Sequence, residues 1–354
     1  MLIQPTTPWR PMTARHQANS HSSPAQAEPS DRVQLTGLVP DYARGSAVVA
    51  HQLVRDLVPS LVGVLYDRLG SAFDLQSVGY QGPRSGYSDP NLVWMRDYHP
   101  LYRRDQNGDL SVVKFLSPNP YRQQYQTATY VPVAPPAPDQ KFFPMPGHQG
   151  RWLPSETAKI QAQGGQLVPT GEFLLVSQGL LDENQTEQPS LSQFGYAPRQ
   201  ADQVLAELST SSATSVEKIL VMPGLPGDKT GHVDMYCQAL APREVLVLDD
   251  EPNRDFLEGQ VARLAQAGLE VERLPSIRAD GHLYSPTNAE LVNVDGQRLC
   301  LLPVPSNPDA TAQQTIQKWQ DFYQSRGWQT QTVPADAAAR ANGLLRCLTY
   351  QVPI

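Results

Sequence analysis

The sequence predicts an α/β protein built from repeated units of a β-hairpin, a helix and a further strand. Two observations predict it. From about Asp41 onward, hairpin-like runs alternate with amphipathic helical runs, which favours α/β over segregated helices and strands. The segments Gly268–Pro275 and Gly327–Pro334 each read as a helix end, a glycine cap, a short strand and a proline, and they lie 59 residues apart. A spacing of this length suits a unit of two or three strands plus one helix.

Composition excludes several classes of protein. The 354 residues include 28 Lys and Arg against 35 Asp and Glu, a net charge of −7, so no basic surface is expected to attract nucleic acid. Charged residues make up 18% and hydrophobic residues 40%, which is typical of a folded chain, and no apolar run approaches the 18 residues of a membrane span. Length alone allows two domains, but the repetition favours a single domain over residues 43–354.

The first 42 residues are rich in Pro, Ser, Gln and Ala and offer no periodic apolar face. We expect a disordered tail there. The segment has no apolar stretch of the kind found in a secretory signal, so a cytoplasmic location is the expectation.

The alternating elements can be placed in order. Turn residues separate β-rich arms at Asn107-Gly108, Thr170-Gly171 and Asp295-Gly296, and a further hairpin is expected within 232–249. Apolar residues at three- and four-residue spacing predict helices at about 47–68, 199–210, 253–267 and 309–325. The three cysteines are too few and too scattered for a disulfide framework, and no CxxC pair indicates zinc.

Polar residues recur at nearly the same interval as the repeat. The set comprises Asp97, the Gly164-Gly165 pair, His232 with Asp234, Asn288 and Cys347, at separations of 67, 68, 56 and 59 residues. If each unit delivers one strand end to a common centre, these residues meet there. Asp234 follows His232 by two residues, so on a strand the two side chains would share a face.

The chemistry of this set points to one kind of ligand. A cysteine with a separate histidine can act as nucleophile and proton shuttle. Two carboxylates beside them suit a planar cation with several N–H donors, and a guanidinium is such a cation. Carboxylates that hold its terminal nitrogens would present the central carbon to a thiolate, which nearby positive charge would favour.

The motifs around these residues resemble those of the bacterial peptidylarginine deiminase and agmatine deiminase family. The resemblance covers roughly residues 75–354 and rests on the order and spacing of four stretches. These are Trp94-Met95-Arg96-Asp97-Tyr98, Gly231-His232-Val233-Asp234-Met235, Thr287-Asn288, and Gly343-Leu344-Leu345-Arg346-Cys347-Leu348-Thr349.

The resemblance implies a pentein fold, a five-fold pseudosymmetric α/β propeller of ββαβ-type units with the active site in a central channel. It implies that Cys347 is the nucleophile, that His232 is the general acid and then the base, and that Asp97 and Asp234 bind the guanidinium. Asn288 occupies a site-lining position. Residues in or beside the motifs are also expected to contact substrate: Trp94, Arg96, Gly164, Gly165 and Arg346.

The implied reaction converts a guanidino group of a small molecule or of peptidyl arginine into a ureido group and ammonia through a Cys347 thiouronium intermediate. No metal or organic cofactor is implied. The sequence leaves open an amidinotransferase that uses the same intermediate and a non-catalytic pentein that binds a guanidine or a protein. It also leaves open which guanidine is the substrate and the oligomeric state.

The chain departs from the family pattern at three places. Many agmatine deiminases carry EGGN where this chain reads Gln163-Gly164-Gly165-Gln166, and His99-Pro100 replaces the usual Gly-Pro. Arg346 stands where family members often have His. Each of these residues could also have only a structural role. Asp97 could form an ordinary ion pair, His232 could be a hydrogen-bonded structural histidine, and the Cys347 thiol could simply pack in the core.

Overall fold

The computed structural model describes residues 37–40, 42, 45–49, 58–69, 94–98, 100–116, 142–144, 152–192, 194–294 and 296–353. Leu35–Ile354 form one compact unit. Among the described helices, none is both long enough and apolar enough to cross a membrane.

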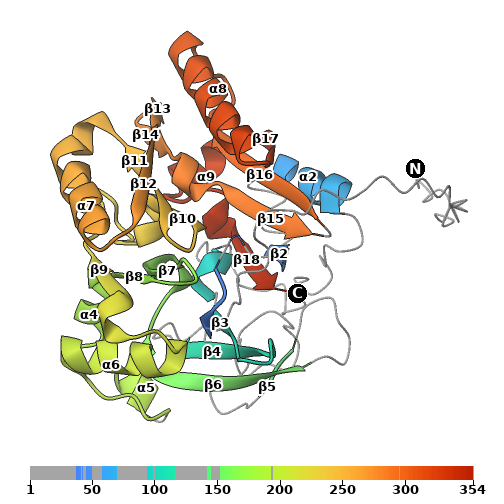
Figure 1. The fold of residues 1–354 in the computed structure, drawn as a ribbon. Coiled ribbons are helices and arrows are strands. Elements are labelled where there is room, and N and C mark those ends of the chain that lie inside the picture. The colour runs from blue at the N-terminus through green and yellow to red at the C-terminus, as the bar shows by residue number, and fades with distance from the viewer. Residues whose placement is uncertain are drawn as a thin grey trace, which may run out of the picture. The chain divides into compact units, whose positions relative to one another are not determined.

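Three consecutive segments of the chain have the same architecture (Figure 1). In each, an antiparallel hairpin is followed by a helix and by a third strand that lies parallel to the second arm. The first comprises β7 (Leu167–Pro169), β8 (Leu174–Ser177), α6 (Ala201–Ser212) and β9 (Ile219–Met222). The second comprises β10 (Cys237–Ala241), β11 (Glu244–Asp249), α7 (Arg254–Gln266) and β12 (Glu270–Pro275). The third comprises β15 (Glu290–Val294), β16 (Gln297–Val304), α8 (Ala310–Ser325) and β17 (Gln329–Pro334).

A fourth sheet follows the same strand pattern with additions at its edges. β3 (Leu101–Arg104) and β4 (Leu110–Leu116) form the hairpin, and β6 (Trp152–Gln161) runs parallel to β4. β1 (Gly37–Leu38) and β5 (Phe142–Pro144) extend the two edges.

A two-stranded antiparallel sheet joins the two ends of the described chain. β18 (Thr349–Pro353) pairs with β2 (Gly45–Val49), so that Thr349 lies opposite Val49. This pairing anchors the residues that directly follow Cys347.

The remaining described elements are short. The helices are α2 (Pro59–Leu69), α4 (Gln178–Glu183), α5 (Pro189–Ser192) and α9 (Asp336–Arg340), and β13 (Ile277–Ala279) pairs with β14 (His282–Tyr284). Two 3-10 turns, η6 (Val216–Lys218) and η8 (Glu251–Asn253), lie on the chain before β9 and α7.

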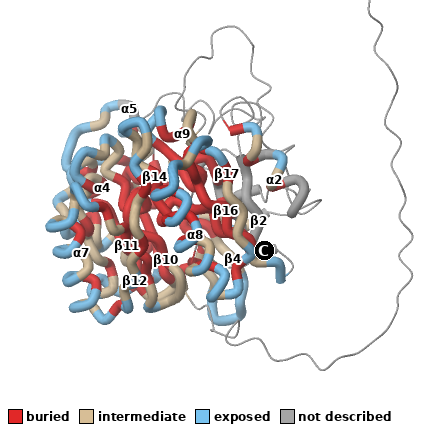
Figure 2. The backbone as a smooth tube through the Cα atoms, turned by 90° about the horizontal axis from the view of Figure 1, so that it is seen from above, coloured by how far each residue is buried: buried red, intermediate tan, exposed pale blue. Residues whose placement is uncertain are grey.

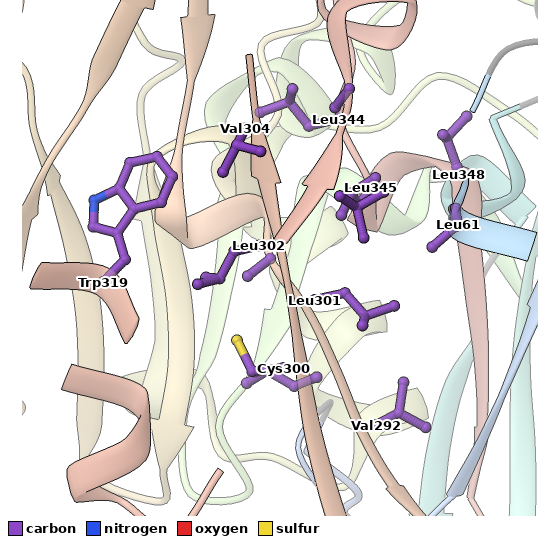
Figure 3. Close-up of a cluster of buried hydrophobic side chains, with 14 of the residues drawn as sticks. Leu61, Val292, Cys300, Leu301, Leu302, Val304, Trp319, Leu344, Leu345 and Leu348 are labelled. Carbon is purple, nitrogen blue, oxygen red and sulfur yellow. The ribbon is translucent and has the colours of Figure 1, made fainter. Parts of the chain in front are cut away.

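α7 and α8 pack on their own sheets, whereas α6 contacts β6 and β3 of the fourth sheet, and the buried residues concentrate in the strands (Figure 2). The largest core cluster includes Cys300, Leu301 and Leu302 of β16 and Trp319 of α8 (Figure 3). The middle strands β8, β11 and β16 are buried on both faces over most of their length, which explains their nearly continuous apolar runs.

α8 also supports the candidate site from behind. The Tyr323 hydroxyl, fully buried, lies 2.8 Å from the Pro286 carbonyl and 2.7 Å from Gln238 Oε1. Pro286 begins the turn that carries Asn288. The helix α8 therefore contributes side chains to the core and also holds the turn that carries Asn288.

The hairpins and the repeated helix-glycine-strand segments predicted from the sequence are confirmed. Gly108, Gly171 and Gly296 adopt positive φ in the hairpin turns, and Gly268 and Gly327 do so at the helix ends. Positive φ is the conformation that glycine adopts without steric cost. Asp295 lies outside the described residues.

Two expectations about the first part of the chain differ from the structure. Of the helix predicted over 47–68, the part from Pro59 is confirmed as α2, but residues 47–49 belong to strand β2, because β2 pairs with β18 and tertiary pairing overrides local periodicity. The boundary of the predicted tail at residue 42 also differs, since Gly37 and Leu38 pair with Arg104 and Arg103 and Leu38 is buried. Residues 1–36 lie outside the described residues.

Candidate active site

Five short 3-10 turns each precede the first strand of a sheet or strand pair, and they carry the predicted site residues. They are η4 (Met95–Tyr98), η5 (Gly164–Gln166), η7 (Val233–Met235), η9 (Pro286–Asn288) and η10 (Arg346–Leu348). η4 contacts η5, η5 contacts η7, η7 contacts η9, and η10 contacts η4. Asn288 donates a hydrogen bond to Cys347 Sγ and accepts one from the Arg346 backbone N–H, which joins η9 to η10. The turns therefore form a continuous ring of contacts.

The ring of contacts agrees with the prediction that these distant residues meet. They lie on or beside 3-10 turns, however, and not at strand ends as expected. His232 is the N-cap of η7 and Asp234 lies inside the turn, so the two do not share a strand face as predicted. A 3-10 turn directs consecutive side chains about 120° apart, which lets one turn present groups in several directions.

The Cys347 thiol is almost fully buried and is held by the Asn288 amide. Asn288 Nδ2 lies 3.4 Å from Cys347 Sγ, and Asn288 Oδ1 accepts a hydrogen bond of 3.1 Å from the Arg346 backbone N–H. Burial raises the pKa of Cys347 to about 12, and the negative charges of Asp234 and Asp97 add to this rise. The thiol is therefore protonated near neutral pH in the free protein.

Asp234 is a completely buried carboxylate between two buried guanidinium groups. Its Oδ2 lies 3.7 Å from Arg96 Nε and 3.6 Å from Arg346 Nε, and both arginines are about 1% exposed. Among the described residues, neither carboxylate oxygen of Asp234 accepts a hydrogen bond. Burial raises the pKa of Asp234, and the charges of His232, Arg346 and Arg96 oppose that rise.

His232 is held by Gln163 of the neighbouring turn η5 and by Thr230 of its own loop. Its Nε2 lies 3.0 Å from Gln163 Oε1, and its backbone N–H donates to the Thr230 hydroxyl at 3.2 Å. A Cβ at Gly165 would stand 2.2 Å from His232 Nδ1. Only glycine at residue 165 leaves room for the imidazole.

The loop before His232 is fastened by side-chain hydrogen bonds. Asp228 Oδ2 accepts from the Thr230 hydroxyl at 2.6 Å and from the Gly231 N–H at 2.8 Å, while the Ser177 hydroxyl donates to the Gly231 carbonyl at 2.6 Å. These bonds fix the backbone that delivers the imidazole.

Asp97 and Trp94 lie at the start of the same ring. Asp97 is partly exposed, in contrast to Asp234, and its charge acts on both Asp234 and Cys347. A Cβ at Gly343 would stand 2.3 Å from the Trp94 ring, so the indole packs directly against the chain that leads to Cys347.

Sequence reasoning missed two residues of this site. Glu290 is fully buried and accepts hydrogen bonds from Thr349 at 2.6 Å and Gln351 at 3.0 Å, and burial raises its pKa. Gln163 contacts the imidazole of His232. Glu290 has no motif of its own, whereas Gln163 could have been found from its place beside the Gly164-Gly165 pair.

The charges of the cluster suit a single bound cation. Three carboxylates, those of Asp97, Asp234 and Glu290, face two guanidinium groups, those of Arg96 and Arg346, which leaves a formal charge of −1. A neutral thiol and an imidazole lie beside them. Among the described residues, no group of three or more His, Cys, Asp or Glu side chains could hold a metal ion.

The other two cysteines lie in the cores rather than in this cluster. Cys237 is fully buried in β10 and Cys300 is fully buried in β16. Burial raises the pKa of both thiols. Their complete burial within the strands indicates a packing role.

Comparisons with known proteins identify the fold. No protein-family model matches the chain, and no curated protein matches its sequence. A Cys-to-Ser variant of agmatine deiminase from C. jejuni with substrate bound has a TM-score of 0.58 at 14% identity, covering 89% of this chain and 95% of that chain. The agmatine deiminase of Enterococcus faecalis has a TM-score of 0.56 at 13% identity, with coverages of 90% and 96%. A candidate peptidyl-arginine deiminase has a TM-score of 0.60 at 14% identity, with coverages of 91% and 100%.

These structural similarities establish the fold of the chain. The chain has the pentein-type α/β fold of these deiminases, over nearly the full length of each matched structure. The resemblance predicted from the four motifs is therefore confirmed at the level of the fold.

Proposed function

We propose that this protein is a deiminase that hydrolyses a guanidino group to a ureido group and ammonia. The observation that carries the proposal is Asp234, a fully buried carboxylate whose oxygens lack hydrogen-bond donors among the described residues, in the same cluster as Cys347 and His232. A buried acceptor without a donor is costly, and a guanidinium supplies charge-assisted N–H donors.

In this proposal Asp234 and Asp97 hold the guanidinium of the substrate. Asp234 binds from inside the cluster, and Asp97, which is partly exposed, binds from the solvent side. Burial raises the pKa of Asp234, and the charges of His232, Arg346 and Arg96 oppose that rise and so favour the ionised carboxylate. We therefore assign the two arginines to the support of Asp234 and not to substrate contact.

Substrate binding would also activate the nucleophile. Asp234 and Asp97 both raise the pKa of Cys347, and a guanidinium bound between them would neutralise that effect and add a positive charge next to the sulfur. The thiolate would then form only when a substrate is present. Asn288, which already contacts the sulfur, would hold it for attack.

The reaction then proceeds in two halves. The Cys347 thiol gives its proton to His232, and its Sγ forms a bond to the guanidinium carbon. His232 then passes this proton to the departing nitrogen, and the carbon–nitrogen bond breaks to release ammonia. This leaves a planar thiouronium on Cys347. His232 next removes a proton from water, whose oxygen attacks the same carbon, and the carbon–sulfur bond breaks to give the ureido product. Proton transfer by such a group contributes on the order of 10² to 10⁴ in rate.

We also propose that the repeats close into five blades around this site. Four hairpin-containing sheets supply four of the blades, and the β18–β2 pair supplies the fifth. The ring of contacts among the five 3-10 turns supports this arrangement, because each turn precedes one blade.

One experiment tests the proposed function. The full chain is incubated with agmatine, with free arginine and with peptides that carry internal or terminal arginine, and ammonia and ureido product are measured together. We expect equal amounts of both from at least one guanidine, and none from Cys347→Ala. Transfer of the amidino group to an added amine without a ureido product would instead identify an amidinotransferase, and turnover of none of these guanidines would refute the proposal.

A further inference from the structure

We infer that Glu290 is a neutral carboxylic acid that positions the turn of Cys347. It donates its proton to the Thr349 hydroxyl, which in turn donates to the Arg346 carbonyl. The inference rests on the proposed function for its effect on catalysis. It goes beyond that function because it gives a role to a buried acid that the reaction itself does not use.

Glu290 connects the chain next to Asn288 with the chain next to Cys347. It is completely buried and begins β15, shortly after the end of η9. Its hydrogen-bond partners, Thr349 and Gln351, lie on β18, which starts directly after η10. The acid therefore joins the two turns that hold the nucleophile.

The proton count at the Thr349 hydroxyl depends on the charge of Glu290. Thr349 Oγ1 lies 2.6 Å from Glu290 Oε2 and 3.0 Å from the Arg346 carbonyl oxygen. A hydroxyl has one proton to donate, and an ionised carboxylate and a carbonyl only accept. With an ionised Glu290, Thr349 donates to the carboxylate, and its contact with the carbonyl holds no proton. With a protonated Oε2, both contacts are hydrogen bonds.

The other carboxyl oxygen of Glu290 acts as an acceptor. Gln351 Nε2 lies 3.0 Å from Glu290 Oε1 and 2.7 Å from the Leu291 carbonyl oxygen. The carbonyl only accepts, so the Gln351 amide turns its nitrogen to this side, and its two protons serve the two acceptors. Glu290 therefore accepts at Oε1 and donates at Oε2, as a carboxylic acid does.

The surroundings of Glu290 favour the same protonation state. Burial raises the pKa of Glu290, while its two hydrogen-bond partners and the charges of Arg346 and Arg96 oppose that rise. Both guanidinium groups lie within ion-pair distance of Asp234, and among the described residues Glu290 takes part in no ion pair. Cys300 of the adjoining strand β16 also interacts with Glu290, and it is a neutral thiol because burial raises its pKa.

The chain of hydrogen bonds ends at the peptide group that joins Arg346 to Cys347. Thr349 donates to the Arg346 carbonyl with its hydroxyl and with its backbone N–H. The Arg346 backbone N–H donates to Asn288 at 3.1 Å. Both backbone groups of Arg346 are therefore held, and the neutral acid frees the Thr349 hydroxyl to take part. Glu290 acts on Cys347 through this backbone, as a positioning residue.

A neutral Glu290 also changes the charge that the Cys347 thiolate meets. Counted with every carboxylate ionised, the cluster has a formal charge of −1. Without the charge of Glu290, the two aspartates of the cluster balance its two arginines. A bound guanidinium and the thiolate that forms beside it then cancel each other, which favours the reactive form of the nucleophile.

Carboxyl ¹³C NMR tests the protonation state. The full chain is labelled with ¹³C at the glutamate side-chain carboxyls, and Glu290→Gln identifies the Glu290 signal by its loss. We expect that signal to keep the chemical shift of a protonated acid at pH 7, a pH well above the ordinary glutamate pKa of about 4.3. Glu251→Gln, at an exposed position of η8, should leave the signal in place.

The same pair of proteins gives a second readout in stability. The folded protein holds the Glu290 proton more tightly than the unfolded chain does. Stability therefore falls as the pH rises from the unfolded pKa of about 4.3 towards the folded one. The Tm of the wild type should accordingly fall relative to the Tm of Glu290→Gln over this range.

Kinetics test the positioning role. Thr349→Val, which keeps the shape of the side chain but removes the hydroxyl, should lower kcat at least tenfold with little change in KM. Thr349→Ser, which restores the hydroxyl, should recover most of that loss. Glu290→Gln should keep kcat at least threefold above that of Thr349→Val, because its amide donates through nitrogen and accepts through oxygen as the neutral acid does.

The possible results separate this inference from the proposed function. A Glu290 signal with the shift of an ionised carboxylate at pH 7, or loss of the fold in Glu290→Gln, would overturn the neutral acid. If the protein deiminates a guanidine and Thr349→Val keeps kcat within threefold of the wild type, the positioning role is overturned and the proposed function stands. The NMR readout needs no substrate, so a protein that deiminates nothing would refute the proposed function while the protonation state of Glu290 is still decided.

Discussion

Asn288 holds Cys347 through both atoms of its side-chain amide. Its Nδ2 lies 3.4 Å from the sulfur, its Oδ1 lies 3.6 Å from the sulfur, and the same oxygen accepts the Arg346 backbone N–H at 3.1 Å. The two residues lie 59 positions apart, the same spacing as the repeated helix-glycine-strand segments. One amide thereby fixes both the nucleophile and the backbone that carries it.

Asn288→Ala should therefore lower kcat by about tenfold to hundredfold, since it removes a hydrogen bond to a group that becomes charged. Steady-state kinetics on the best guanidine substrate checks this. Asn253→Ala, which removes an amide that binds Asp250, is the matched control and should leave kcat unchanged. Equal kcat values for Asn288→Ala and the wild type would show that the amide has no part in the reaction.

Asp234→Asn should lower kcat/KM by more than a hundredfold, because a buried guanidinium loses its charged partner. The loss should be smaller for Asp97→Asn, since Asp97 is partly exposed. Asp250→Asn is the control: Asp250 is also buried, but its partners are Arg278 and Ser276. That variant should lower Tm and leave kcat/KM within threefold. A change below threefold for Asp234→Asn would argue against guanidinium binding by this carboxylate.

Gly165→Ala should displace the imidazole of His232, because the new Cβ would lie 2.2 Å from Nδ1. We expect kcat to fall at least tenfold while the protein stays folded by circular dichroism. Gly259→Ala places its Cβ in open space on α7, and it should raise Tm slightly through helix propensity without changing kcat. Normal turnover by Gly165→Ala would mean that the ring tolerates another position.

The raised pKa of Cys347 predicts a specific pH dependence of alkylation. A group with a pKa of about 12 is mostly thiol at neutral pH, so the thiolate fraction rises tenfold per pH unit between pH 7 and pH 10. The rate of iodoacetamide labelling at Cys347, followed by mass spectrometry, should rise in the same proportion. An unreactive cation such as an alkylammonium should increase the rate at pH 7 by occupying the site. A plateau below pH 9 in the free protein contradicts this account.

The repeat and the site could largely be predicted from the sequence because local chemistry dictates both. Gly268 and Gly327 adopt the positive φ that commonly ends a helix, and the glycines of the hairpin turns adopt the positive φ that those turns require. The near-regular spacing then placed the site residues at equivalent points of successive units: Asp97, Gly164, His232, Asn288 and Cys347. Their residue types indicated the chemistry.

Other features could not be predicted because they depend on contacts between distant segments. β2 is a strand only because β18 pairs with it, and Glu290 is buried beside Thr349 and Gln351 only after the ring has formed. The ion pairs of Arg96 and Arg346 with Asp234 likewise join separate turns. Neither periodicity nor composition in one segment reports such contacts.

The most direct test is to trap the covalent intermediate. The full chain is mixed with a guanidine substrate, quenched with acid within the first turnover and digested for peptide mass spectrometry. We expect the peptide containing Cys347 to gain the mass of the substrate less one ammonia, His232→Gln to accumulate this adduct, and Cys347→Ala to lack it. Turnover to a ureido product with no adduct on Cys347, or with the adduct on Cys237 or Cys300, would contradict the proposed mechanism.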